Sequence, residues 1–218
     1  DFNELPEKRI ALVIGNSTYK DTPLKNPVND ADSITNVLRN ELDFEVIKVK
    51  NANFRDMNTA MNRFDRKLLQ IDKSRYRVVA LFYYSGHGMQ HDGNTYLLPV
   101  RYNIGSLADL QYEAVNCQRI IDRLQIGKHY LSLLMLDACR TNSLTKSLAS
   151  LFKRDDDPFA GYAPPKSSQS SESGGMYISY ATAPDKPALQ GEADANNSPY
   201  VKGFLNNIRT PNLSISDL

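Results

Sequence analysis

Short apolar runs rich in β-branched and aromatic residues alternate along the chain with stretches in which apolar residues recur every three or four positions. Runs of the first kind predict buried strands, and stretches of the second kind predict helices that cover a sheet. This alternation is typical of an α/β fold with a mostly parallel central sheet and helices on both faces. The expected strands are 9–15, 44–49, 78–84, 131–136 and 176–184, and the expected helices are 29–42, 54–70, 115–125 and 199–208.

The composition is that of a single ordinary domain. The 218 residues include 26 basic and 25 acidic side chains, which leaves a net charge of +1. A chain with so small an excess of positive charge is not typical of proteins that bind nucleic acid through phosphate contacts. No apolar run approaches the roughly 20 residues of a membrane-spanning helix. We therefore expect neither a nucleic acid nor a membrane as partner.

The chain contains two cysteines, Cys117 and Cys139. So few cysteines exclude a disulfide framework and favour a reducing compartment, which predicts a cytoplasmic protein. They lie too far apart in sequence, as do His91 and His129, to predict a zinc site, so we expect no bound metal or cofactor. Because the first residue is Asp1 and not Met, we expect a fragment or a processed product.

Polar residues capable of chemistry follow three of the predicted strands. His87 stands between two glycines after the third strand, and Asp137 and Cys139 follow the fourth. Asp30 lies beyond the loop after the first strand, where it or Asn29 could instead cap the following helix. Ligands bind beyond the carboxyl ends of parallel strands. We therefore expect the four side chains to line one cleft.

A thiol and an imidazole at one edge of a sheet predict nucleophilic catalysis. The thiolate is the nucleophile, and a nearby imidazole can accept its proton or, when charged, stabilise the anion. Cys139 and His87 form such a pair. The backbone N–H groups of Gly88 and Cys139 could then hold the developing oxyanion. Glycines beside His87 would let a substrate peptide lie against the main chain.

Each of these residues also has a structural interpretation. A histidine in a glycine-rich loop is more often structural than catalytic, and a cysteine at a strand end is usually a small buried apolar residue. Asp137 alone is compatible with a helix cap. The common position of His87, Asp137 and Cys139 at one edge favours the catalytic interpretation. We interpret Cys117, in a predicted helix, as structural.

Two motifs, YYSGHG (83–88) and LDACR (136–140), place a histidine about 50 residues before a cysteine. In this they resemble the caspase-like cysteine peptidases. Asp137 stands where the caspase motif has glutamine, which indicates the branch of the paracaspases and their bacterial homologues, the orthocaspases. The segments KRIALVIGNSTY, LKNPVNDADSITNVLR and NTYLLPV extend the resemblance over roughly residues 8–208.

The resemblance implies a caspase-like α/β fold in three parts. A large-subunit-like part spans 8–152, an intersubunit-type loop spans 153–175, and a small-subunit-like part spans 176–218. The composition of the loop, which is rich in Pro, Ser, Gly and charge, also predicts an exposed, mobile segment. The last part ends without a capping element, so we expect the natural chain to continue. The resemblance further implies that His87 and Cys139 form the catalytic dyad of an endopeptidase.

The resemblance also implies cleavage after Arg or Lys, with Asp30 and Asp137 in the S1 pocket that takes the P1 side chain before the cleaved bond. Independently of the family, two carboxylates suit a guanidinium, which binds carboxylates through paired hydrogen bonds. The resemblance assigns Ser179, Tyr180 and Ala181 to the strand that pairs with the substrate backbone. Peptides and proteins with a basic P1 residue are therefore the expected substrates.

The loop offers three basic residues for self-cleavage, Lys153, Arg154 and Lys166. Cleavage there would process a zymogen. A calcium-dependent metacaspase-type peptidase remains an alternative, since Asp155–Asp157 could attract a hard cation. A second alternative is a catalytically idle scaffold that uses the fold to bind a partner. An activating partner or a homodimer is compatible with each interpretation.

Overall fold

The computed structural model describes residues 4–91, 93–127, 130–138, 175–181 and 196–210. Within these residues a central sheet of five parallel strands runs in the order β2-β1-β3-β7-β8. The strands of this sheet are β1 (Glu7–Gly15), β2 (Phe44–Lys50), β3 (Arg77–Gly86), β7 (Leu131–Ala138) and β8 (Gly175–Tyr180).

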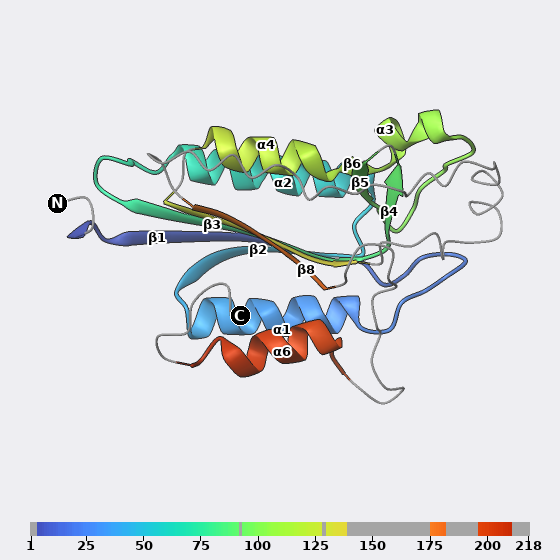
Figure 1. Ribbon diagram of the computed structural model, residues 1–218. Coiled ribbons are helices and arrows are strands. Elements are labelled where there is room, and N and C mark those ends of the chain that lie inside the picture. The colour runs from blue at the N-terminus through green and yellow to red at the C-terminus, as the bar shows by residue number, and fades with distance from the viewer. Residues whose placement is uncertain (1–3, 92, 128–129, 139–174, 182–195, 211–218) are drawn as a thin grey trace.

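Helices cover both faces of the sheet (Figure 1). One face carries α1 (Pro27–Asn40) and α6 (Pro199–Asn207), and the other carries α2 (Phe54–Leu69) and α4 (Cys117–Ile126). The predicted α/β class, with a parallel sheet between two layers of helices, is confirmed. None of the helices in the described ranges is both long and apolar enough to cross a membrane.

The pleat of the central strands divides the core into two halves. Tyr84 points to the half that α2 and α4 cover, whereas its neighbour Tyr83 points to the half that α1 and α6 cover. Met57 and Met61 of α2 are buried in the first half, as the helical spacing of the methionines predicts. Both tyrosine side chains are fully buried, so each hydroxyl lies inside the protein.

A second, smaller sheet stands beside the functional edge. It consists of β4 (Gly88–His91), β5 (Asn94–Leu97) and β6 (Val115–Asn116), paired antiparallel. A 3₁₀ helix (Leu107–Asp109) and α3 (Leu110–Glu113) precede β6. The sequence analysis did not predict these elements, and it placed the start of the following helix two residues too early.

Two strands reach further toward the functional edge than predicted. β3 continues to Gly86 and β7 to Ala138. Asp137 therefore lies inside a strand, and its interpretation as a helix cap is wrong. β8 ends at Tyr180, short of the predicted end, and Ala181 is a bend.

The predicted cap of the first helix is also wrong. α1 has Pro27 as its first residue and Asn26 as its N-cap. Proline suits the first helical position because its missing N–H would have no partner there. Asp30 consequently lies in the first turn of the helix, where its side chain is buried.

The strand register aligns the carboxyl ends of the sheet. Gly15 pairs with Ser85 across β1 and β3, and Gly86 pairs with Ala138 across β3 and β7. β8 continues the same edge, because its last residue pairs with a residue near the end of β7. The edge predicted to carry the chemistry therefore exists in the fold. The predicted loop 153–175 lies outside the described residues.

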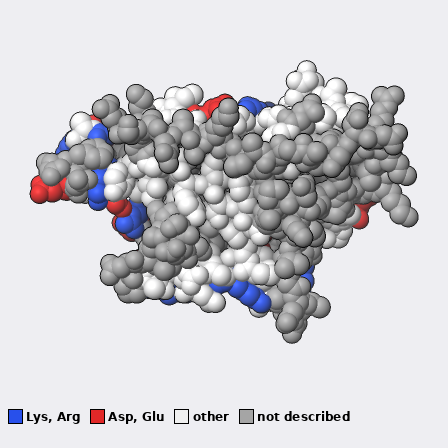
Figure 2. Space-filling view, in the orientation of Figure 1, with Lys and Arg blue, Asp and Glu red and all other residues white. Residues whose placement is uncertain are grey.

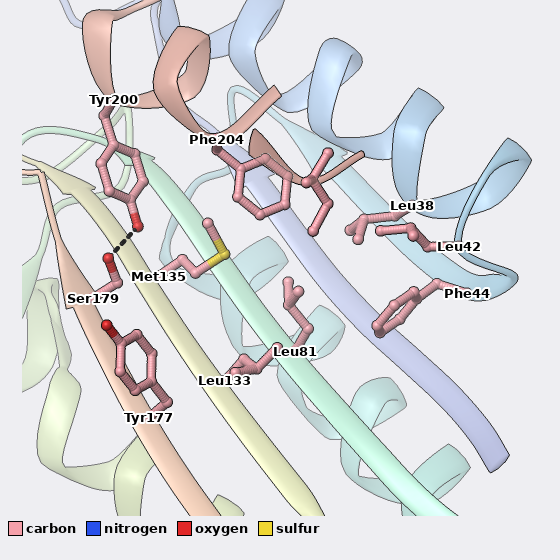
Figure 3. A pocket seen from close by; sticks show the side chains of 11 residues that line it. Leu38, Leu42, Phe44, Leu81, Leu133, Met135, Tyr177, Ser179, Tyr200 and Phe204 are labelled. Atoms are coloured by element: carbon pink, nitrogen blue, oxygen red, sulfur yellow. Dashed lines mark hydrogen bonds between the residues drawn. The ribbon is translucent and has the colours of Figure 1, made fainter. Parts of the chain in front are cut away.

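Two aromatic residues of α6, Tyr200 and Phe204, pack against the sheet (Figure 3). Phe204 is buried beside Met135 of β7, and both line a mostly apolar pocket between the two helices and the sheet. The hydroxyl of Tyr200 donates to Ser179 Oγ of β8 over 2.8 Å. Figure 2 shows that the described residues in the middle of the facing surface are uncharged. These contacts fix the start of α6 near the end of β7.

Candidate active site

A single residue, His87, joins the large sheet to the small one. It stands between Gly86, the last residue of β3, and Gly88, the first residue of β4. A Cβ atom at Gly86 would lie 2.6 Å from the hydroxyl oxygens of both Tyr19 and Tyr84. The close approach of these two hydroxyls therefore explains the glycine before His87.

The imidazole of His87 is buried and oriented by a loop residue. Its Nε2 lies 2.8 Å from the carbonyl oxygen of Thr22 and 3.1 Å from the Thr22 hydroxyl. Because a carbonyl only accepts hydrogen bonds, this contact favours the tautomer that carries its proton on Nε2. Nδ1 is then a proton acceptor, and within the described residues it is buried without a hydrogen-bond partner.

Burial lowers the pKa of His87 below its usual value, and the contact with the Thr22 carbonyl acts in the opposite direction. The lower pKa keeps the ring neutral at neutral pH. The ring of Tyr19 packs against it with a centroid distance of 4.3 Å and a tilted geometry. The site therefore presents a neutral imidazole whose free nitrogen can take a proton.

Asp30 and Asp137 are held by the residues that begin α6. Asp30 Oδ1 accepts hydrogen bonds from Asn197 Nδ2 and from the backbone N–H of Ser198, each over 2.9 Å. Asp137 Oδ2 accepts a hydrogen bond of 2.5 Å from Ser198 Oγ. Ser198 also accepts a bond from Val201 and thereby caps the helix. One serine thus joins both carboxylates to the start of α6.

The acidic pair still has capacity to accept hydrogen bonds. Asp30 Oδ2 is buried and lacks a hydrogen-bond partner within the described residues. Asp30 is fully buried and Asp137 is 6% exposed, although neither forms an ion pair with a described residue. Buried carboxylates without a cation are costly, and a cation that pairs with them removes part of this cost.

Burial raises the pKa of both carboxyl groups. For Asp137 the pKa rises to about 7, and the nearby charge of Asp30 adds to the increase, while the Ser198 hydrogen bond opposes it. For Asp30 burial also dominates, against the hydrogen bonds from Asn197 and Ser198. Near neutral pH, and without a bound cation, the two carboxyl groups together therefore carry less than two negative charges. A bound cation would favour the fully ionised pair.

The structure brings the predicted acidic residues together but does not describe the predicted nucleophile. Cys139 lies outside the described residues, directly after Ala138 in sequence. His87 in turn directly follows Gly86, which is the register partner of Ala138. The predicted histidine and cysteine therefore each follow one member of the same pair on adjacent strands.

The predicted substrate strand, β8, is one of the two outer strands of the described sheet. Ser179 accepts the hydrogen bond from Tyr200, and Tyr180 is the last residue of β8. The N–H of Ala181 donates to Leu136 O over 2.9 Å, so this amide is engaged within the sheet. Gly88, the other predicted oxyanion donor besides Cys139, is buried at the start of β4 and pairs with Leu97.

The predicted self-cleavage sites Lys153, Arg154 and Lys166 lie outside the described residues, as does the acidic run of the calcium alternative. Among the residues that are described, no group of three or more metal-ligating side chains is close enough to hold a metal ion. Cys117 is buried at the start of α4, which agrees with its interpretation as a structural residue.

Three residues of the site were not predicted. Thr22 lies in a loop without any local pattern, and its role follows only from its contact with His87. Asn197 and Ser198 carry a signal, because a serine followed by proline before an apolar helical stretch is typical of a helix start. That signal predicts the cap of α6, but it does not predict that the cap contacts Asp30 and Asp137.

The chain is similar to known proteins over most of its length. Residues 8–218 match the family described as the caspase domain. The chain is 36% identical over 140 residues to the human protein named Mucosa-associated lymphoid tissue lymphoma translocation protein 1, and equally to its mouse homologue. Each of these alignments covers 62% of this chain and 15% of the relative. The chain therefore spans a small part of the length of these relatives.

Proposed function

The chain belongs to the caspase-domain family of cysteine peptidases, in its paracaspase and orthocaspase branch, and from this premise we propose that it is an endopeptidase that cleaves after Arg or Lys. The observation that carries the proposal is the register pair Gly86 and Ala138, because His87 and Cys139 directly follow its two members in sequence. Adjacent strands are about 4.8 Å apart. This spacing suits a dyad.

In the proposed mechanism the thiol of Cys139 gives its proton to Nδ1 of His87, and the resulting thiolate attacks the carbonyl carbon of the substrate. The backbone N–H groups of Gly88 and Cys139 stabilise the oxyanion. The imidazolium then donates its proton to the leaving amine, and water hydrolyses the thioester with His87 as base. The contact between Nε2 and Thr22 holds the ring in the required tautomer.

The proposed P1 specificity rests on the buried acidic pair. Asp30 and Asp137 are joined by Ser198, and Asp30 Oδ2 has no hydrogen-bond partner among the described residues. A guanidinium or an ammonium group can donate to these oxygens, whereas an aspartate side chain would be repelled. The substrate backbone would lie along β8 near Ser179, Tyr180 and Ala181.

The remaining expectations become part of the same proposal. The protein acts in the cytoplasm on protein or peptide substrates and uses no metal or cofactor. Cleavage at Lys153, Arg154 or Lys166 converts a zymogen into a processed form, and a partner or a second copy of the chain can contribute to activation. Activity that is lost in EGTA and restored by calcium would instead support the metacaspase-type alternative.

Fluorogenic peptides that differ only in the P1 residue test the proposal. We expect wild-type protein to hydrolyse peptides ending in Arg or Lys and not those ending in Asp, and Cys139→Ala to be inactive on all of them. Equal hydrolysis of peptides ending in Arg and in Asp would contradict the assigned specificity. An absence of any cysteine-dependent hydrolysis would favour the idle scaffold.

A further inference from the structure

Two buried tyrosine hydroxyls hold the main chain of the proposed catalytic histidine. We propose that Tyr19 and Tyr84 are positioning residues that fix the peptide of His87, so that its ring presents Nδ1 to the nucleophile. This inference rests on the proposed function, because it assigns a role to residues that act through His87. Neither tyrosine needs to touch the substrate.

The N–H and the carbonyl group of His87 both form hydrogen bonds with these two side chains. The N–H of His87 donates to Tyr19 Oη over 2.9 Å, and Tyr84 Oη donates to the carbonyl oxygen of His87 over 2.7 Å. The same carbonyl also accepts the N–H of Leu98 over 2.9 Å. The two tyrosine hydroxyls therefore fix the main chain of His87 at the junction where the pairing of β3 ends and that of β4 begins.

One assignment of the hydrogen atoms gives each hydroxyl a main-chain acceptor for its proton. Tyr19 accepts from the N–H of His87 and donates its own proton to Leu98 O, 2.9 Å away. Tyr84 donates to His87 O, although its oxygen also lies 2.8 Å from Leu98 O. Each hydroxyl has one proton and one main-chain acceptor for it. Without the Tyr19 hydroxyl the buried N–H of His87 loses its hydrogen-bond partner, whereas without the Tyr84 hydroxyl the His87 carbonyl keeps only the bond from Leu98.

Both hydroxyls stay protonated, as this assignment requires. The two tyrosines are buried, and burial is the main cause that raises the pKa of each hydroxyl above its usual value. Their oxygens lie 3.1 Å apart, on the side of β3 opposite to Tyr83. A side chain at Gly86 would collide with both. Gly86 therefore leaves space for both hydroxyls beside the main chain of His87.

The hydroxyls act on the peptide, whereas the aromatic rings fill the core. The ring of Tyr19 packs against the imidazole with a centroid distance of 4.3 Å, and the ring of Tyr84 belongs to the core beneath α2 and α4. Tyr→Phe substitutions keep both rings and remove only the oxygens. They therefore separate positioning of His87 from packing, which a change to alanine would not do.

The test measures the reactivity of Cys139 directly, without a substrate. Wild type, Tyr84→Phe, Tyr19→Phe and His87→Ala are alkylated with iodoacetamide from pH 5.5 to 9, and mass spectrometry of the peptides reports the rate at each cysteine. We expect both Phe variants to be alkylated at Cys139 more slowly than wild type at pH 7, in the direction of His87→Ala. We also expect kcat for an Arg-ended peptide to fall about tenfold while KM stays within about twofold, as for a misplaced catalytic group.

Two controls keep the outcome unambiguous. Val78→Ala creates a small cavity in the same half of the core, at the opposite end of β3, and should lower stability without changing the pH profile of alkylation. Protection of the buried Cys117 reports that each variant is folded. If one Phe variant fails to fold, the other still tests the inference, because it removes the hydrogen bond to the other main-chain group of His87.

The outcomes separate this inference from the proposed function. Normal alkylation and kcat in both Phe variants, with slow alkylation in His87→Ala, would overturn the positioning role and leave the dyad intact. Normal alkylation in His87→Ala as well would overturn the dyad and, with it, the positioning role. If Val78→Ala changed the alkylation of Cys139 as much as the Phe variants do, the effect would be due to lost stability. This result would also overturn the inference.

Discussion

At the scale of single residues, Asp137 shows a conflict between stability and function. Its carboxyl group is buried near a second carboxyl group, and its pKa is raised to about 7. Ionisation of a carboxyl group with such a raised pKa lowers the stability of the folded protein. Such a group is a suitable choice for a pocket that takes a cation, because the cation supplies the missing partner.

The raised pKa of Asp137 predicts that stability depends on pH. In the unfolded chain the carboxyl group titrates near pH 4, so between about pH 4 and 7 the folded state holds a proton that the unfolded state lacks. Stability therefore falls as pH rises through this window and is constant above it. We expect Asp137→Asn to unfold with a free energy roughly 2–4 kcal/mol higher than wild type at pH 8 and with little difference near pH 4.

Urea unfolding at pH 4.5, 6 and 8 measures this difference. The substitution keeps an oxygen that can accept the bond from Ser198, so the comparison isolates the charge. The same variant should lose hydrolysis of Arg-ended peptides at every pH. A variant that shows the pH dependence of the wild type would mean that Asp137 is not the group that titrates.

Ser198 provides a second prediction at this scale. Its hydroxyl donates to Asp137 and lowers the pKa of that carboxyl group. Ser198→Ala should therefore raise the pKa of Asp137 further, move the pH for half-maximal kcat/KM upward, and lower kcat/KM for Arg-ended peptides at pH 7 about tenfold. Initial rates from pH 5.5 to 9 measure the shift.

The matched control for this prediction is Asn116→Ala. Asn116 caps α4 through a bond to the N–H of Gln118, so its loss removes a helix cap as Ser198→Ala does. It caps another helix, and α4 lies on the face of the sheet opposite to α6. An equal pH shift in both variants would attribute the effect to helix capping.

Some residues of the site can be predicted from the neighbouring sequence, whereas others depend on partners that are distant in the sequence. His87, Asp30 and Asp137 could be predicted because they stand next to strand or helix patterns in the sequence. Thr22 and Ser198 could not, since their partners lie 65 and 61 positions away and depend on how two loops meet the sheet edge. Cys139 was predicted from the same local pattern as Asp137, and its role stays a prediction.

At the scale of elements, the junction of β3 and β4 has the strictest requirement. We expect Gly86→Ala to displace His87, because its Cβ would lie 2.6 Å from two hydroxyl oxygens, and to lower kcat for Arg-ended peptides by at least about tenfold. Gly203→Ala is the control, because a Cβ there meets no atom within 4 Å inside α6.

The control should raise stability by roughly 0.5–1 kcal/mol, since alanine is a better helix former than glycine. Thermal unfolding and steady-state kinetics of both variants decide the comparison. Wild-type kcat in Gly86→Ala would contradict the tight junction. A loss of activity in Gly203→Ala of the same size would show that the assay responds to any change at these glycines.

Prediction of the elements succeeded where periodicity was long and failed where it was short. α2 buries five apolar residues on one face and is found at almost its predicted ends. β4 and β5 have four residues each and contain polar residues such as Gln90 and Asn94, so neither alternation nor length separates them from a loop. In the fold, β5 pairs with both β4 and β6, and this pairing makes them strands.

At the scale of the whole molecule, the site is assembled from segments far apart in the sequence. Thr22 and Asp30 lie between β1 and β2, and His87 follows β3. Asp137 is the penultimate residue of β7, and Ser198 is the N-cap of α6. The parallel sheet brings these segments to one edge. The predicted loop 153–175 lies between β7 and α6 in the sequence, and both of these elements contribute to the proposed pocket. We therefore expect cleavage in this loop to affect the pocket.

Self-cleavage is the prediction that concerns the chain as a whole. Purified wild-type protein should accumulate fragments whose new C-terminal residue is Lys153, Arg154 or Lys166, because these basic residues lie in a loop that the composition predicts to be exposed. Cys139→Ala should remain intact under the same conditions. Mass spectrometry of both proteins over time gives the fragment ends, and identical fragments in both would exclude self-processing.

The most direct measurement of the central claim is covalent labelling with an active-site-directed peptide ketone that ends in Arg, read by mass spectrometry of the labelled peptide. We expect one label per chain, on Cys139, with labelling lost in His87→Ala and strongly slowed in Asp137→Asn. An otherwise identical ketone ending in Asp should leave the protein unlabelled. Equal labelling by both ketones, or a label on Cys117, would contradict the account.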